Sequence, residues 1–175
     1  MQNYRMNYCP RCGHELTTRY VQDHERPACP NCGYVAFLNP VLAVGVLATD
    51  EENRVVLILR GGEPGRGLWA LPAGAMEADE SVEECARREC LEETGLKVEL
   101  DELWDVWSYE PTAYSRAGVF IAYRAHIVGG EPRAGSDAAD VRFFKLDEIP
   151  YSQLAFSMHR EALERLFASF NNPAT

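Results

Sequence analysis

The chain has 175 residues, of which 46% are hydrophobic, and a formal net charge of −10 at pH 7. This length allows one ordinary domain with a small appendage, and the apolar content allows a buried core. The negative charge argues against a protein that binds a nucleic-acid backbone, because such proteins favour a basic face. No apolar run approaches the roughly 20 residues of a membrane span, and the first residues lack the apolar core of a signal peptide. We therefore expect a cytoplasmic protein with neither nucleic acid nor membrane as a partner.

The first 38 residues contain two cysteine pairs, Cys9 with Cys12 and Cys29 with Cys32, and a glycine follows each pair. The gap of two residues lets a tight turn direct both sulfur atoms at one ion, and the glycine permits the backbone conformation that such a turn requires. Four thiolates make a closed tetrahedral zinc site of the structural kind. A unit this small cannot fold on a hydrophobic core alone, so Zn²⁺ would supply its stability.

From residue 39 onward the pattern changes to strands and helices. Continuous apolar runs predict buried strands at 41–50 and 53–60, joined by a turn. Residues 61–74 contain five glycines and two prolines, which is typical of a loop. In this loop, Trp69 and Leu71 are expected to anchor the chain against the core.

An acidic helix is predicted after this loop. Ser81 and Glu84 have the spacing of a capping box, and Gly95 is a natural residue to end the helix. Val82, Ala86 and Cys90 share one stripe, which is expected to pack against a sheet.

The remaining elements follow from the same kinds of pattern. Strands are predicted at 96–100, 106–110, 117–128 and 141–146, with a polar loop at 129–140. Residues 157–170 predict a final amphipathic helix whose apolar face carries Leu163, Leu166, Phe167 and Phe170.

Three carboxylates of the acidic helix share one face, because Glu89, Glu92 and Glu93 have i, i+3 and i+4 spacing. On an exposed face each like-charge pair would cost only about 0.2–0.5 kcal/mol, so the helix alone does not decide their role. In a cleft, two charges about 6 Å apart would repel by roughly 3 kcal/mol at an effective dielectric constant of about 20. Such a cluster requires a cation, and oxygen ligands suit Mg²⁺ or Mn²⁺.

The wider spacing decides between these alternatives. Gly74-x5-Glu80-x7-Arg88-Glu89-Cys90-x-Glu92-Glu93-x-Gly95-Leu96 resembles the Nudix box at every fixed position. The one departure is Cys90, where the family usually has an aliphatic residue. Cysteine packs as a small hydrophobe, so this departure puts little in doubt.

The resemblance implies an α/β fold for residues 39–175, an α/β/α sandwich with a mixed sheet, preceded by a zinc ribbon at 1–38. It implies hydrolysis of the pyrophosphate bond in a nucleoside diphosphate linked to another group. Glu89, Glu92, Glu93 and the backbone carbonyl of Ala73 would hold Mg²⁺ or Mn²⁺, and a water activated by the ions would attack one phosphorus atom.

Four other box residues would have structural roles. By the same resemblance, Glu80 and Arg88 would hold the loop and the helix together as an ion pair, and Gly74 and Gly95 would complete the box. The general base stays open among Glu89, Asp137 and Asp140.

Three further segments, "CPRCG…CPNCGYVAFLNP", "GLWALPAGAMEADES" and "LDEIPYSQLAFS", resemble a zinc-ribbon subgroup of the family that includes a plant chloroplast FAD/ADP-ribose pyrophosphatase. FAD or ADP-ribose is therefore the expected substrate. An NADH pyrophosphatase is the alternative, although the Ser-Gln-Pro-Trp-Pro-Phe-Pro-type segment of that relative is absent after the box. An inert binding module is a third possibility, but the box carboxylates are all present.

Basic and aromatic residues outside the box could contact such a substrate. Arg60, Arg66 and Arg116 lie in or beside loops and could reach phosphates, although each could equally serve solubility. Among Trp104, Trp107, Tyr109 and Tyr114, one could stack on adenine or flavin, and we select Tyr109. His126 and His159 are given no role. The zinc ribbon could brace a homodimer.

Overall fold

The computed structural model describes residues 6–111 and 116–171. The chain divides into two compact units, Met1–Pro40 and Val41–Thr175, a division two residues from the boundary expected at residue 38. Within the described residues, no helix has the length and apolar character needed to cross a membrane.

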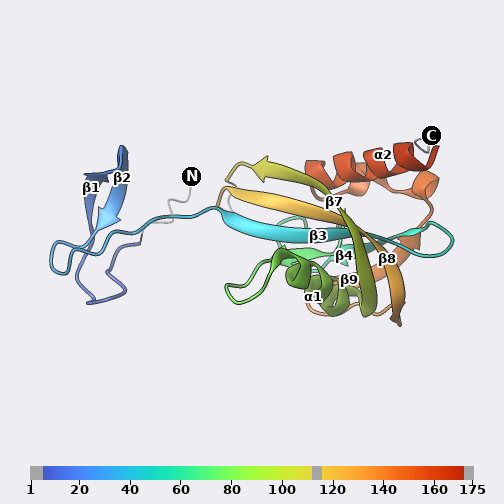
Figure 1. Cartoon of the computed structure of the whole chain (residues 1–175), viewed down its shortest axis with the longest axis horizontal. Helices are drawn as coiled ribbons and strands as arrows, with labels where there is room; N and C mark the ends of the chain where they lie inside the picture. Colours follow the sequence, from blue (N-terminus) through green and yellow to red (C-terminus); the bar gives the residue numbers. More distant parts are fainter. Residues whose placement is uncertain (1–5, 112–115, 172–175) are drawn as a thin grey trace. The chain divides into compact units, whose positions relative to one another are not determined.

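The first unit is a small two-stranded structure (Figure 1). Strand β1 (Thr17–Val21) pairs antiparallel with β2 (His24–Ala28) through a tight turn. Besides two cysteines, its buried apolar residues within the described range are Ala28 and Ala36. Two alanines bury too little surface to hold a fold together, which agrees with the expectation that this unit needs a metal.

The second unit is built on a mixed seven-stranded sheet with one helix on each face (Figure 1). The main strand order is β5-β4-β3-β8-β7, with β6 paired to β3 and β9 paired to β4. Strands β3 and β8 run parallel, and the other pairs run antiparallel. The elements are β3 (Val41–Thr49), β4 (Val55–Arg60), β5 (Trp69–Ala70), β6 (Ala73–Ala75), α1 (Val82–Thr94), β7 (Leu96–Tyr109), β8 (Gly118–Gly130), β9 (Ala138–Phe144), two short 3₁₀ turns (Leu146–Glu148 and Tyr151–Gln153) and α2 (Ser157–Asn171). The α/β/α sandwich implied by the sequence is confirmed.

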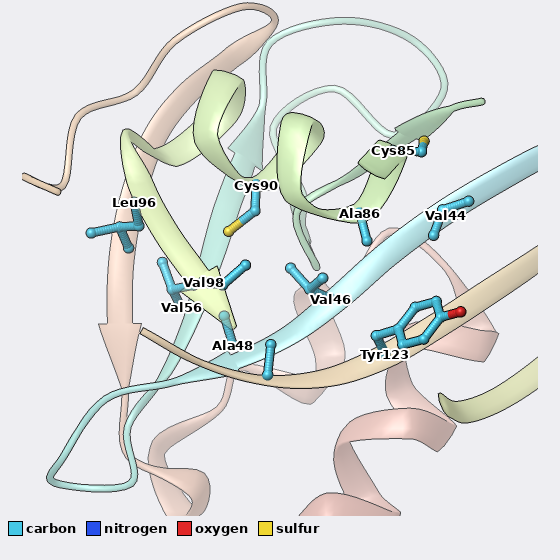
Figure 2. Packing of buried hydrophobic residues seen from close by; sticks show 11 residues of the cluster. Val44, Val46, Ala48, Val56, Cys85, Ala86, Cys90, Leu96, Val98 and Tyr123 are labelled. Carbon is cyan, nitrogen blue, oxygen red and sulfur yellow. The ribbon is translucent and has the colours of Figure 1, made fainter. Parts of the chain in front are cut away.

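The core lies on both faces of the sheet, which explains why β3 is apolar throughout. Val44, Val46 and Ala48 pack with Ala86 and Cys90 of α1 (Figure 2). The alternate residues of β3 face a second cluster, which includes Trp69 and Leu71 and is covered by Leu163 and Leu166 of α2. A strand covered on both faces reads as a continuous hydrophobic run.

Helix α1 begins and ends where the sequence predicts. The Ser81 side chain accepts from the Glu84 amide while the Glu84 side chain accepts from the Ser81 amide. Gly95 ends the helix in the left-handed conformation, with φ 73°. The predicted stripe packs on the sheet, with Ala86 and Cys90 fully buried and Val82 half-buried.

Three features differ from the sequence expectation. The strands expected at 96–100 and 106–110 are one strand, β7, whose register with β8 shifts at three places. These irregularities break the alternation that reveals a strand in sequence. The loop at 61–74 contains two short strands, β5 and β6. Phe167 is 38% exposed, because the buried stripe of α2 also includes His159 and Ala162 and leaves Phe167 at its margin.

Candidate active site

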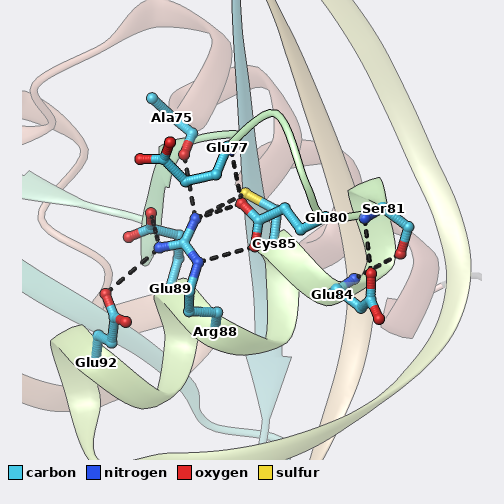
Figure 3. Close-up of polar contacts among 9 residues, drawn as sticks. All are labelled: Ala75, Glu77, Glu80, Ser81, Glu84, Cys85, Arg88, Glu89 and Glu92. Carbon is cyan, nitrogen blue, oxygen red and sulfur yellow. Dashed lines mark hydrogen bonds and ion pairs between the residues drawn. The ribbon is translucent and has the colours of Figure 1, made fainter.

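The loop before α1 is tied to the helix by Arg88 (Figure 3). Its guanidinium forms two hydrogen bonds with Glu80, at 2.6 and 2.9 Å, and a third with the Ala75 carbonyl at 3.2 Å. Glu80 in turn accepts from the backbone amide of Glu77. The hydrogen bond from Arg88 lowers the pKa of Glu80 to about 2. The structure therefore contains the ion pair expected between Glu80 and Arg88.

Gly74 gives the Glu89 carboxylate its place against this loop. A Cβ atom at Gly74 would lie 2.2 Å from the carboxylate of Glu89, a distance that no side chain could occupy. Glu89 is also paired with Arg88, at 2.5 Å. Arg88 thus positions one carboxylate of the predicted metal site and at the same time braces the loop.

Glu93 is almost completely buried, with 1% of its surface exposed. Its Oε2 atom accepts a hydrogen bond from the Ala73 amide at 2.8 Å. Burial, and then the negative charges of Asp137 and Glu89, raise the pKa of Glu93 to about 8 despite that hydrogen bond. Burial also raises the pKa of Glu89. These carboxylates are concentrated where negative charge is costly, and a cation would relieve that cost.

The backbone of Ala73 faces the same region. Strand β6 pairs with β3 through the residues on either side of Ala73, since Val46 donates to the Pro72 carbonyl at 3.0 Å. In a strand, the N–H and C=O of one residue point the same way. The Ala73 carbonyl therefore lies on the side of β6 where its amide meets Glu93.

A cavity of about 580 Å³ opens beside these groups, within the usual size range of ligand sites. Four carboxylates of its lining are Glu89, Glu92, Glu93 and Asp137, and Glu110 adds a fifth. The apolar and aromatic part of the lining includes Tyr109, Phe120, Phe156, Met158 and His159. The cavity therefore combines a strongly acidic region with a surface suited to a planar ring.

The two candidate loop acids lie in different surroundings. Asp137 lines the cavity, and its loop is fixed at both sides: the Gly61 amide donates to the Asp137 carbonyl at 2.8 Å, and the Gly135 amide to the Glu93 carbonyl at 3.2 Å. Asp140 is paired with Arg142 at 2.8 Å and is not among the residues that line the cavity.

Of the four predicted substrate-binding residues, two line the cavity and two do not. Arg60 lines the cavity; its Nε donates to the Pro64 carbonyl at 2.6 Å and its guanidinium lies 5.3 Å from the ring centre of Phe156. Tyr109 lines the cavity and lies over Gly118, where a Cβ atom would be 2.2 Å from the tyrosine ring. Arg66 and Arg116 are exposed and do not line it.

The other aromatic candidates do not line the cavity in the described residues. The indoles of Trp104 and Trp107 donate to α2, to the Ala162 carbonyl at 3.3 Å and to the Glu161 carboxylate at 3.1 Å. Tyr114 lies outside the described residues.

Apart from Tyr109, sequence reasoning missed the aromatic lining. Phe120 comes from β8, Phe156 directly precedes α2, and His159 lies in the first turn of that helix. Phe120 reaches its position because β3 carries Gly45 beside it, where a Cβ atom would be 2.9 Å from the phenylalanine ring. Nothing in the local pattern distinguishes these residues from core residues, because only strand pairing and the packing of α2 on the sheet bring them together.

The cysteines form a compact ligand set. Their four sulfur atoms lie within 4.8 Å of one another, and two pairs are separated by 3.4 and 3.5 Å. Tetrahedral zinc with bonds of about 2.3 Å separates its sulfur ligands by about 3.8 Å, so the set fits such an ion. Gly13 and Gly33 both have φ 73°, as the predicted turns require.

The carboxylates form a looser set. Among the described residues, the cysteines are the one group of three or more potential ligand residues whose ligand atoms all lie within 4.8 Å. The carboxylate set nevertheless offers only oxygen atoms, as Mg²⁺ and Mn²⁺ prefer. Glu92, half exposed at 50%, has the freedom to turn toward an ion shared with the other two.

Comparison with known proteins identifies similar enzymes. The chain is 39% identical over 125 residues to an ADP-ribose pyrophosphatase of Methanocaldococcus jannaschii, covering 70% of this chain and 71% of that one. It is 33% identical over 165 residues to an NAD-capped RNA hydrolase NudC of Pseudomonas aeruginosa, covering 92% of this chain but 55% of the relative. This chain therefore spans about half the length of that second protein.

A solved structure agrees. A NUDIX hydrolase from Nitrosomonas europaea superposes with a TM-score of 0.86 at 32% identity, covering 96% of this chain and 94% of the other. The family described as the NUDIX domain matches residues 39–166, which include all the carboxylates of the cavity. The chain therefore belongs to the Nudix hydrolase family, whose enzymes act on acid-anhydride bonds.

Proposed function

We propose that this enzyme hydrolyses the pyrophosphate bond of ADP-ribose, giving AMP and ribose 5-phosphate. The proposal rests on one observation: a single cavity of about 580 Å³ is lined both by four carboxylates and by an aromatic surface. The carboxylates come from α1 and from the loop at 135–137. A pyrophosphate flanked by a nucleoside needs both features: cations for its charge and a flat apolar surface for its base.

Glu89, Glu92, Glu93 and the Ala73 carbonyl would hold Mg²⁺ or Mn²⁺. When bound, such ions offset the charge of the pyrophosphate and lower the pKa of a water molecule. Arg88 holds Glu89 in place, and the Ala73 amide fixes Glu93, so two of these side chains are positioned before substrate arrives.

We assign the general base to Asp137 in preference to Asp140. Asp137 lines the cavity, whereas Asp140 is paired with Arg142 outside it. Glu89 remains the alternative base, although its carboxylate is already engaged by Arg88 at 2.5 Å. Arg60 would contact a phosphate or ribose oxygen, since it is a cationic group of the cavity lining.

Substrate choice rests on the relatives. A protein 39% identical is named an ADP-ribose pyrophosphatase, which favours ADP-ribose over FAD. Both molecules share an adenosine diphosphate half, so both belong in the test.

A second candidate is the pyrophosphate of an NAD-type dinucleotide, free or at the end of an RNA. The relative named NAD-capped RNA hydrolase covers 92% of this chain and supports it. The net charge of −10 weighs against extended contacts with an RNA backbone.

The test is product analysis by chromatography after incubation with ADP-ribose, FAD, NADH and NAD-capped RNA, each with Mg²⁺, Mn²⁺ or EDTA. AMP release from ADP-ribose, abolished by EDTA, is the expected result. Preferential cleavage of NADH or capped RNA would establish the second candidate. No turnover of any of the four would overturn both and favour a binding module.

For the first unit we propose a structural Zn²⁺ bound by Cys9, Cys12, Cys29 and Cys32. The compact sulfur set and the small apolar core of that unit support it. Metal analysis of the purified protein should find one zinc per chain.

A further inference from the structure

His159 occupies an unusual position in the cavity lining. It lies in the first turn of α2, is 3% exposed, and packs between two aromatic rings, with its ring centre 4.8 Å from that of Phe120 in a tilted contact and 5.0 Å from that of Phe156 in an edge-to-face contact. It also lines the cavity. A histidine with so little exposed surface has few water molecules to bond with, so the hydrogen-bond partner of each ring nitrogen has to be accounted for.

One partner determines where the proton resides. The backbone amide of Leu71 donates to Nδ1 of His159 at 3.1 Å. A backbone N–H can only donate, so Nδ1 carries no proton and the neutral ring must carry it on Nε2. Burial, aided by the positive charge of Arg60, lowers the pKa of His159 to about 3, so the ring stays neutral at physiological pH. His159 is therefore held as a hydrogen-bond donor at one atom.

That donor is available to a ligand. No described residue accepts a hydrogen bond from Nε2 of His159. Among the described residues, every side-chain nitrogen or oxygen that is fully buried does have a hydrogen-bond partner. Nε2 is therefore not sealed in the core, and the cavity is the open space that His159 lines.

The surroundings indicate which group would accept. The ring neighbours of His159 are apolar, and Met158 and Tyr109 extend the same lining. A neutral donor among aromatic rings matches a neutral acceptor on a planar heterocycle better than a phosphate, whose charge is served by Arg60 and the cations. A ring nitrogen of a purine has this character.

We propose that Nε2–H of His159 donates a hydrogen bond to a ring nitrogen of the substrate's adenine, held against Phe120 and Phe156. This proposal rests on the proposed function. It makes His159 a specificity-determining residue that takes no part in the chemical step.

The test is a cycle of variants and substrate analogues. ADP-ribose and its 1-deaza, 3-deaza and 7-deaza forms each lack at most one acceptor nitrogen. With the wild-type enzyme, one deaza form should lose about tenfold in kcat/KM, mainly through KM. His159→Phe should lose about tenfold on ADP-ribose and nothing further on that deaza form.

The matched control is His159→Gln, whose amide can both accept from Leu71 and donate to the substrate. It should recover most of the activity that His159→Phe loses. The proposal is wrong if, for every deaza form, the loss in kcat/KM of His159→Phe on that form equals the product of the two separate losses. It is also wrong if no deaza form loses activity with the wild-type enzyme.

A second measurement uses the wild-type protein alone. Long-range ¹H–¹⁵N NMR should show Nε2 protonated and Nδ1 unprotonated, and the Nε2 signal should move when the non-hydrolysable α,β-methylene analogue of ADP-ribose is added with Mg²⁺. The opposite tautomer, or an unmoved signal, would overturn the inference. If the enzyme cleaves ADP-ribose but the Nε2 signal does not move, this inference alone is wrong. If ADP-ribose is not cleaved, the proposed function is wrong.

Discussion

The two candidate metal sites of this protein are built in opposite ways. The cysteine site has ligand atoms already within 4.8 Å of one another, in a unit whose described residues bury two alanines besides two of the cysteines. The carboxylate site has looser ligands on a unit with two large apolar clusters. A metal that holds a fold together needs closed, preassembled ligands, whereas a metal that exchanges substrate needs a rigid scaffold and open positions. The comparison predicts that metal loss unfolds one unit and only inactivates the other.

The largest effect is expected from Cys29→Ser, because zinc binding contributes on the order of 10 kcal/mol to the folding of such small units. This variant should lose zinc and all hydrogen-exchange protection in β1 and β2, while the amides of β3 and β8 stay protected. His14→Ala is the control, since the exposed His14 is not part of the sulfur set and its loss should leave zinc bound. Zinc retained by Cys29→Ser would contradict the contrast between the sites.

The second effect is a pH dependence of stability in the metal-free protein. The pKa of Glu93 is about 8 in the folded protein, so the native state binds more protons than the unfolded state between about pH 4.5 and pH 8. The contribution to stability is complete below about pH 4.5 and is lost as pH rises through 8, by at most about 5 kcal/mol.

Urea unfolding in EDTA between pH 5 and pH 9 measures this effect. Mn²⁺ should remove most of the decline, because it binds the ionised carboxylate. Glu93→Gln, which cannot ionise, should show a smaller decline than the wild type. Parallel curves for the two proteins would show that Glu93 is not the group that titrates.

The third prediction concerns catalysis. Glu93→Gln should lower kcat at least about 100-fold, because it removes a charged ligand from a site that must hold cations. The amide oxygen can still accept from Ala73, so the fold should persist. Glu164→Gln makes the same change on an exposed position of α2 and should leave kcat as it is. Near-wild-type turnover in Glu93→Gln would remove the carboxylate site from the mechanism.

The smallest expected effect is that of Gly74→Ala. The added Cβ would displace the Glu89 carboxylate, and a shift of about 1 Å in a catalytic group costs roughly 10- to 100-fold in rate. Gly62→Ala is matched to it, because Gly62 has open space around its Cα. Steady-state kinetics of both variants would decide; equal rates would mean that Glu89 tolerates displacement.

Local parts of this molecule could be read from sequence because their contacts are local. The capping box joins Ser81 to Glu84, and Arg88 contacts residues within thirteen positions of itself. Each cysteine pair is separated by two residues, so its turn is set by its own glycine. At such short separations, residue type and spacing largely determine geometry.

The selection among candidates required the tertiary structure. Asp137 and Asp140 are equivalent in sequence, but the hydrogen bonds of Gly61 and Gly135 place one loop acid in the cavity while Arg142 engages the other. Arg60 and Arg66 are likewise similar in sequence context. Arg60 is the last residue of β4 and lines the cavity, whereas Arg66 lies in the loop beyond the strand and does not.

The sequence by itself determined the family, the α1 box and the cysteine set, because their spacing carries the geometry. Only the tertiary structure decided which aromatic residues line the cavity and that His159 is buried with Nε2 as its donor. Phe120 meets Gly45 through the parallel pairing of β3 with β8, and His159 meets Leu71 across 88 residues of chain. Contacts of that separation depend on strand register and helix packing, which no local pattern of residues encodes.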